Sequence, residues 1–438
     1  MNRLRALWQN LNSSLWFVPT LMVAGSLVLA FGLVLAEPFL DHDQLANYPL
    51  LFGAGADGAR GMLTAIAGSM ITVAGLIFSL TLSTLAQVSS QYTSRVLRNF
   101  MRDRTNQLIL GFFVSIFAYC LIVLRTIRGG DEGRFIPSLA VGVGLVLALL
   151  SIGVLIFFIH YMASSIQAAN IIRNASQETE AAITRLFPEE LGGEASAAEA
   201  RQLLEQAGEL RWQPVPARAT GYVQSISEDS LLALARELQG VVRLEHGIGG
   251  FVARGAALVS VARYGAHPAP LPDELTGQIN QLFSLGNQRT IEQDASFGLR
   301  QIVDIALKAL SPGINDTTTA IICVDHLGAL LAQLADRQLP EPLRVADRQV
   351  RVVAVRPSFE KMLATAFDQI RISAEANLGV YLRLLTALAT VAQRTDHPER
   401  RAALRQQAGL VMAAAERTLS TDYERQQVRE RRAGLPLG

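Results

Sequence analysis

The sequence is poor in the residue types on which most catalytic and metal sites depend. Its 438 residues include only two cysteines, Cys120 and Cys323, and neither has a second cysteine at the spacing of a disulfide framework or a zinc site. The six histidines are scattered, without the short spacing of a metal-binding pair. Nucleophile-elbow and P-loop motifs are absent too. We therefore expect no metal and no cofactor, and no motif identifies a catalytic residue.

An excess of charge of either sign is also lacking. The 39 Lys and Arg residues against 38 Asp and Glu residues leave a formal net charge of +1. Lysine itself is almost absent, since it occurs only at Lys308 and Lys361. This balance gives no reason to expect nucleic acid as a partner.

Long apolar runs are what the sequence does have, and all four lie before residue 163. They are Trp16–Ala36, Gly61–Leu85, Gln107–Leu124 and Phe135–Tyr161. A helix needs about 20 apolar residues to cross a hydrocarbon core roughly 30 Å thick. The runs predict four transmembrane helices, followed by a region rich in Arg, Glu, Asp and Gln that is typical of a soluble domain.

Arginines in the connections predict the orientation in the membrane. The second connection carries four of them: Arg95, Arg98, Arg102 and Arg104. The N-terminus carries Arg3 and Arg5, whereas the first connection has Arg60 as its only basic residue. Basic loops stay on the cytoplasmic side. We therefore expect a multi-pass protein of the bacterial inner membrane with both termini in the cytoplasm.

The fold class expected is a mainly α membrane protein with a cytoplasmic α+β domain. Four parts are predicted: a transmembrane domain (1–165), a helical stalk and linker (166–210), a β-rich subdomain (211–268) and a helical subdomain (269–438). The stretch Tyr161–Leu186 contains no Gly or Pro, so we expect helix from about Phe135 to Leu186 without a break of more than a residue or two. Glycine-punctuated short strands after residue 220 predict a small structural half-barrel. That unit contains no lysine to carry a prosthetic group, which excludes a biotinyl or lipoyl carrier.

The second span carries a stripe of polar residues on one side of the predicted helix. Its candidate pore-lining residues are Thr72, Ser79, Ser83, Gln87 and Ser90. Polar groups in a membrane must face protein or water. Close helix–helix packing and a water-filled path are both compatible with the stripe. Likewise, the four arginines of the second connection are candidates either for contact with anionic lipids or for an anion-attracting vestibule.

Two further groups of polar residues lie in the cytoplasmic part. The first is a corner between two apolar helices, interpreted as a structural turn or an anion site: Ser311, Gly313, Asn315, Asp316 and Thr317. The second is interpreted as a buried ion-pair network rather than a metal or catalytic site: Arg289, Asp294, Arg300 and Asp304.

These motifs resemble a known family. The segments that carry the resemblance are Phe78–Thr81, Arg98–Phe100, Arg289-Thr290, Gln293-Asp294, Phe297-Gly298 and above all the run from Asp304 to Thr317. They are similar to the predicted bacterial membrane proteins grouped as domain of unknown function 2254. The resemblance implies an inner-membrane protein with four spans and a cytoplasmic domain, and it implies no activity.

The function expected first is an oligomeric ion channel or channel-like transporter, because four spans are too few to enclose a path alone. Its expected partners are further copies of itself and anionic lipids. Two alternatives remain: a membrane-anchored signalling or scaffold protein, and a membrane-tethered enzyme that uses the region of Asp294, Asp304 and Asp316.

Overall fold

The computed structural model describes residues 16–39, 55–91, 103–128, 135–165, 167–187, 202–203, 205, 210–264, 271–291, 293–339 and 342–436. The chain divides into two compact units, Met1–Asn170 and Ile171–Gly438. We call them the membrane unit and the C-terminal unit, and describe each by itself.

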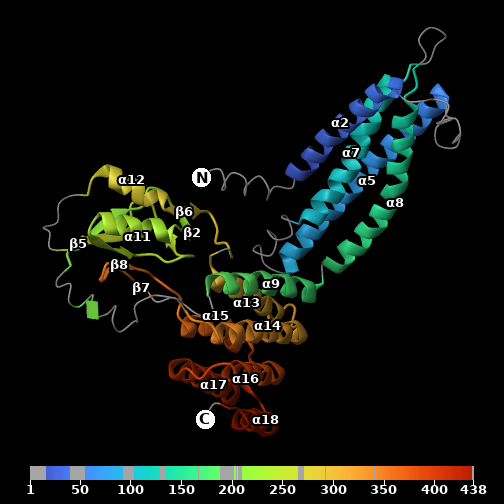
Figure 1. Cartoon of the computed structure of the whole chain (residues 1–438). Coiled ribbons are helices and arrows are strands. Elements are labelled where there is room, and N and C mark those ends of the chain that lie inside the picture. The colour runs from blue at the N-terminus through green and yellow to red at the C-terminus, as the bar shows by residue number, and fades with distance from the viewer. Residues whose placement is uncertain are drawn as a thin grey trace. The chain divides into compact units, whose positions relative to one another are not determined.

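The membrane unit is a bundle of four apolar helices, as the four runs predicted (Figure 1). They are α2 (Phe17–Ala36), α5 (Ala56–Gln91), α7 (Arg104–Thr126) and α8 (Ser138–Ser165), with a short 3-10 turn, η1 (Glu37–Phe39), after α2. All four are long and apolar enough to cross a membrane. The chain is therefore a multi-pass membrane protein.

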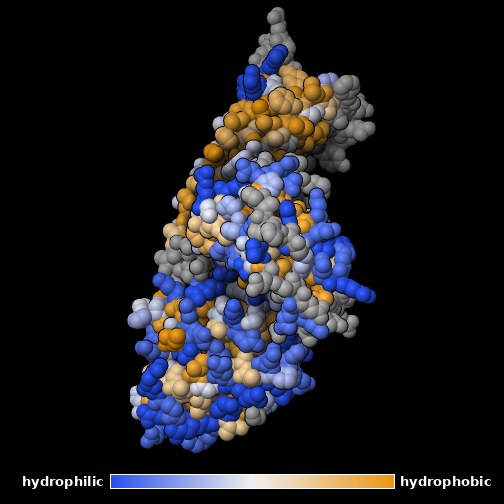
Figure 2. All heavy atoms as spheres, turned by 90° about the vertical axis from the view of Figure 1, so that its left-hand side faces the viewer, coloured by the Kyte–Doolittle hydropathy of each residue, from blue (hydrophilic) through white to orange (hydrophobic). Residues whose placement is uncertain are grey.

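Helix α7 is the centre of this bundle, because α2, α5 and α8 all pack against it. Phe113, Ile116 and Tyr119 of α7 are at most 1% exposed. Gly111 allows α2 to approach, since a Cβ there would lie 3.0 Å from the Cα of Pro19. The face of the unit seen in Figure 2 is largely apolar, and large apolar side chains are exposed on all four helices, as expected of helices that contact lipid.

Helical structure continues beyond the fourth span with a short break. Helix α8 ends at Ser165 and α9 (Ala168–Leu186) begins at Ala168, while residue 166 lies outside the described residues. The prediction allowed such a break, but two helices replace the single continuous helix. From Ile171 onward α9 is part of the C-terminal unit, where Gly298 of α13 (Ala295–Ala309) lies against Thr179.

The β-rich part contains two open sheets instead of the predicted half-barrel. The five-stranded sheet has the order β1-β5-β3-β8-β7 and the three-stranded sheet the order β4-β2-β6. The strands are β1 (Gln213–Pro216), β2 (Gly221–Ile226), β3 (Gly240–Leu244), β4 (Phe251–Val252), β5 (Ala257–Arg263), β6 (Phe283–Gly286), β7 (Leu343–Ala346) and β8 (Gln349–Val353). Strand β8 pairs in parallel with β3. The β7–β8 hairpin, which lies after residue 340, therefore belongs to the five-stranded sheet, although the predicted β-rich subdomain ended at residue 268.

Two short helices accompany the sheets: α11 (Glu228–Glu237) and α12 (Asp273–Gln281). Leu231 of α11 belongs to one apolar core with Val242 of β3, Val261 of β5 and Val352 of β8, all at most 5% exposed. Alternation along the strands directs these side chains to the same face of the five-stranded sheet.

The helical part consists of α13, α14 (Thr317–Ala335), α15 (Phe359–Ser373), α16 (Leu378–Ala392), α17 (Pro398–Thr418) and α18 (Asp422–Ala433). The sequence analysis found apolar runs of membrane-spanning length only before residue 163. Helix α14 corrects this expectation, because it is also long and apolar enough to cross a membrane. Its neighbours α13, α15 and α16 already bury its apolar side chains, among them Leu327 and Leu331. Burial in a helical core therefore accounts for its composition.

Arginines bind the ends of two helices in this part. Arg337 donates to the carbonyl of Phe187, just after α9, at 2.7 Å. Arg400 donates to the carbonyls of Ala335 at 2.8 Å and Arg337 at 3.0 Å, at the end of α14. Cations are favourable at helix C-termini because they compensate the unpaired carbonyls there.

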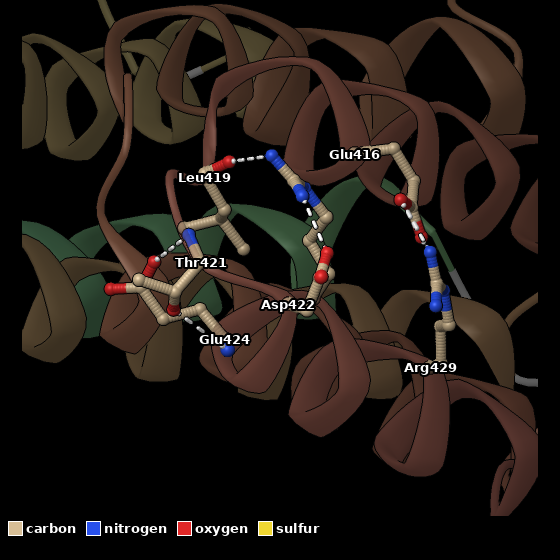
Figure 3. A network of polar contacts seen from close by, with 7 residues as sticks. Glu416, Leu419, Thr421, Asp422, Glu424 and Arg429 are labelled. Atoms are coloured by element: carbon tan, nitrogen blue, oxygen red, sulfur yellow. Dashed lines mark hydrogen bonds and ion pairs between the residues drawn. The ribbon is translucent and has the colours of Figure 1, made fainter.

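The turn between α17 and α18 is held by polar contacts (Figure 3). Thr421 accepts from the amide of Glu424 at 3.2 Å, while the Glu424 carboxylate accepts from the amide of Thr421 at 3.1 Å, forming a capping box. Arg429 binds Glu416 with two hydrogen bonds of 2.6 and 2.8 Å. These contacts fix α18, in which only Val428 is buried.

Candidate functional site

The polar stripe of α5 lies on the outer side of the membrane unit. Thr72, Ser79, Ser83 and Gln87 are exposed, whereas α5 faces the bundle with Ala74, Ile77 and other buried positions. Ser90 is within α5, but its side chain is outside the described part. No described helix of the membrane unit covers the stripe, so helix packing within that bundle does not account for it.

Glycines repeat along the same outer face. Gly61, Gly68 and Gly75 are seven residues apart, and a Cβ built on each meets nothing within 4 Å. Thr72 and Ser79 follow at the same period, four residues after Gly68 and Gly75. Small residues at this spacing let a second helix approach closely in a membrane.

Two hydroxyl groups of this face donate hydrogen bonds to carbonyls of their own helix. Ser69 and Thr72 donate to the carbonyls of Ala65 and Gly68, each at 2.8 Å. Both residues are exposed on the bundle surface, and polar groups in contact with lipid tails are unfavourable. Contact with protein or water is therefore more favourable for this face than contact with lipid.

A second polar group, which sequence reasoning missed, lies inside the bundle near the end of α5. Thr81 of α5 donates to the Asn106 carboxamide oxygen at 3.3 Å, and both residues are buried. Gln107 is 1% exposed beside them. Asp103 caps α7 by accepting from the amide of Thr105 at 3.0 Å. The available signal was the Asn106-Gln107 pair at the start of an apolar run.

A buried carboxylate at the other end of the unit was missed as well. Glu37, 2% exposed, accepts from the amides of Ser138 at 2.7 Å and Leu139 at 3.2 Å. It therefore satisfies the first amides of α8 from a distant part of the chain. Arg60 donates to the carbonyl of Ile127 at 3.0 Å.

The arginine group of the second connection is described only in part. Arg104 is exposed and begins α7, while Arg95, Arg98 and Arg102 lie outside the described residues. Lipid contact and an anion vestibule therefore both stay predictions.

The corner before α14 has the geometry of a helix cap. Asp316 accepts from the amide of Thr319 at 3.0 Å and from its hydroxyl at 2.6 Å, and these bonds lower the pKa of Asp316. Asn315 has a positive φ of 49°, a conformation that asparagine tolerates better than most residues. Thr317 accepts from the side chain of Asn377, the cap of α16, at 2.7 Å. Ser311 and Gly313 complete the turn that precedes this cap.

The four charged residues nearby form two ion pairs among the described residues. Arg289 donates twice to Asp294, at 2.9 and 2.7 Å, and Arg300 donates to Asp304 at 2.9 Å. Burial raises the pKa of Asp294, against the opposing effect of Arg289. Among the described residues, no group of three or more His, Cys, Asp or Glu residues is placed to bind a metal.

Comparison with known proteins places the chain in a family. A family model described as a predicted membrane protein (DUF2254) matches residues 12–390. An uncharacterised protein of Mycobacterium tuberculosis and one of Mycobacterium bovis are each 35% identical over 431 residues, which cover 98% of this chain and 81% of theirs. No solved structure matched. The match over most of the chain, together with the apolar bundle described above, shows that the protein belongs to the DUF2254 family of predicted membrane proteins, whose function is unknown.

Proposed function

We propose that this protein is an oligomeric channel, or channel-like transporter, of the bacterial inner membrane. The outer faces of α5 from several copies would enclose a shared polar path. One observation carries the proposal: Thr72, Ser79, Ser83 and Gln87 are exposed on a membrane helix, and no described helix of the membrane unit covers them.

The glycine repeat supports association of the same face. Because Gly61, Gly68 and Gly75 have no side chain, the backbones of two α5 helices can approach each other at these positions. Van der Waals contacts and hydrogen bonds between the helices can then replace contacts with lipid. A period of seven residues is the period at which helices cross at a shallow, left-handed angle. Four helices with an outward stripe cannot form a path within one copy, which is why the proposal requires an oligomer.

Orientation follows from the arginine distribution and is part of the proposal. Both termini and the C-terminal unit are placed in the cytoplasm, where that unit would serve assembly or gating, and the second connection would contact anionic lipids. A reporter fused after residue 58 should then report the periplasm, and one fused after residue 260 the cytoplasm. The opposite result at 260 would exclude a cytoplasmic gating role.

Cysteine labelling in membranes tests the shared path. Cysteines at Ser79, Ser83 and Gln87 should react with a membrane-impermeant thiol reagent, because reaction requires a thiolate and hence water. Cysteines at Ala74 and Ile77 face the bundle and should stay unlabelled. The native cysteines Cys120 and Cys323 are both buried, so the background should be low.

The scaffold alternative gives the reverse outcome. If the α5 faces of different copies pack without water, none of the five positions reacts, and a bulky residue at Ser79 disrupts assembly by overpacking. Labelling only at Ser79, Ser83 and Gln87, with ion flux from proteoliposomes, supports the channel. Silence at all five positions, or a monomer in the membrane, would refute it.

A further inference from the structure

A carboxylate continues the outer face of α5 into the first turn of the helix. The other members of that face are exposed glycines and hydroxyl residues: Gly61, Gly68, Thr72, Gly75 and Ser79. At about 100° per residue, Asp57 and these five positions lie within an arc of about 60° around the helix axis. Asp57 is therefore the end of the same stripe, and its side chain is fully exposed.

The ordinary role of an acidic residue in a first turn is to compensate the partial positive charge of the helix N-terminus. That role does not depend on the face of the helix. Asp57 lies on the exposed face, away from the buried positions Ala59, Leu63 and Ala67. Compensation of the helix dipole thus explains an acidic residue in this turn but not the face that it occupies.

The other charged residue of α5 is bound to the bundle. Asp57 and Arg60 are the two charged residues of this helix. Arg60 donates to the carbonyl of Ile127, at the end of α7, at 3.0 Å. Its ion pair with Asp57 measures 3.8 Å, which is longer than a hydrogen bond, and exposed pairs of this kind contribute little. Arg60 therefore compensates the Asp57 carboxylate only weakly.

The hydroxyl groups of the face also favour cations. Ser69 and Thr72 donate their protons to carbonyls of α5, so their oxygens can only accept further interactions. Rings of acidic side chains and oxygen acceptors line cation pathways, whereas rings of Arg or Lys line anion pathways. Neither Arg nor Lys occurs on the described part of this face.

We infer that the shared path admits small inorganic cations such as K⁺, and that the Asp57 carboxylates of the assembled copies form the ring that selects them at its mouth. This inference rests on the proposed function, because a ring exists only where the α5 faces of several copies meet. A carboxylate about 4 Å from a monovalent cation raises its local concentration about fivefold in water. The selection should weaken between about 0.1 M and 1 M salt, as the Debye length falls from about 10 Å to about 3 Å.

Reversal potentials of the full-length protein in planar bilayers of zwitterionic lipid, under a KCl gradient, test the ring. At about 0.1 M KCl the wild type should pass K⁺ at least about fivefold better than Cl⁻, and this ratio should fall as the salt rises to about 1 M. Asp57→Asn should lower the ratio about fivefold at the lower salt concentration. Asp57→Glu should keep the ratio, because it keeps the charge.

Asp229→Asn is the matched control and should leave the ratio unchanged, because Asp229 is likewise an exposed acidic residue in a first turn, that of α11 in the C-terminal unit. A wild type that conducts without preferring K⁺ refutes the ring and leaves the channel standing. The same holds if Asp57→Asn keeps the wild-type ratio, or if Asp57→Glu loses it as Asp57→Asn does. A wild type without any current refutes the channel itself, and the ring with it.

Discussion

Gly298 should be a position where one methyl group destabilises the C-terminal unit. A Cβ there would lie 2.8 Å from Cγ2 and 2.9 Å from Cβ of Thr179, which is fully buried on α9. Carbon atoms pack at about 3.5 to 4.0 Å, so α9 and α13 must separate. Overpacking costs about 1 to 3 kcal/mol, while replacing a helical glycine by alanine gains about 1 kcal/mol of helix propensity. We expect Gly298→Ala to lower the free energy of unfolding by about 1 kcal/mol net.

Gly409 of α17 provides the control, because nothing lies within 4 Å of a Cβ built on it. Gly409→Ala should raise stability by up to about 1 kcal/mol, so the same substitution has opposite signs at the two sites. Thr179→Ala should relieve part of the Gly298→Ala penalty, which a double-mutant cycle detects as coupling.

The assay is urea unfolding of the full-length protein in detergent, with hydrogen exchange used to locate the effect. Gly298→Ala should accelerate exchange in α9 and α13, and Gly409→Ala should not. If Gly298→Ala stabilised the protein as Gly409→Ala does, with no coupling to Thr179, the close packing of α9 on α13 would be wrong.

Three further predictions concern the cap, a hairpin and the buried carboxylate. Asp316→Ala should lower the free energy of unfolding by about 1 kcal/mol at neutral pH. Because bonds from Thr319 lower the pKa of Asp316, this difference from the wild type should disappear as the pH falls below about 4. A difference that stays unchanged at low pH would count against the cap. Arg348→Gly should raise the free energy of unfolding by about 0.5 to 1 kcal/mol, since Arg348 (φ 58°) follows Asp347 (φ 55°) in a turn with positive φ at both residues. A loss of stability would contradict the turn geometry. Glu37→Ala should lower the melting temperature in detergent by removing about 1 to 2 kcal/mol of capping, whereas no change would show that Glu37 does not hold the start of α8.

Local features of the fold could be predicted from the sequence because they depend on neighbouring residues. Apolar runs of membrane-spanning length gave the four helices of the bundle, since no other backbone structure satisfies its hydrogen bonds in lipid. Glycine-punctuated segments predicted short strands after residue 220, and β2, β3 and β5 lie there. The segment Asn315-Asp316 lies between α13 and α14, and Asp316 caps α14 because a helix cap needs only residues within one turn.

The candidate site was predicted less completely. Helical periodicity grouped Thr72, Ser79 and Ser83 on one face of α5, but it could not tell whether that face is inside or outside the bundle. Glu37 and Asn106 were overlooked because a lone polar residue at the end of an apolar run has no pattern of its own, and only contacts with Ser138 and Thr81 give these residues a role.

The sequence by itself thus determined which residues share a helix face, where helices begin and that the chain crosses a membrane, because periodicity, caps and hydropathy are local. Only the tertiary structure decided that the polar stripe of α5 faces away from its own bundle. The tertiary structure also decided that β8 pairs with β3, about a hundred residues away in the sequence. It likewise decided that the apolar side chains of α14 are buried against other helices. In each case the outcome depends on which distant surfaces meet, and the local pattern of residues carries no information about that.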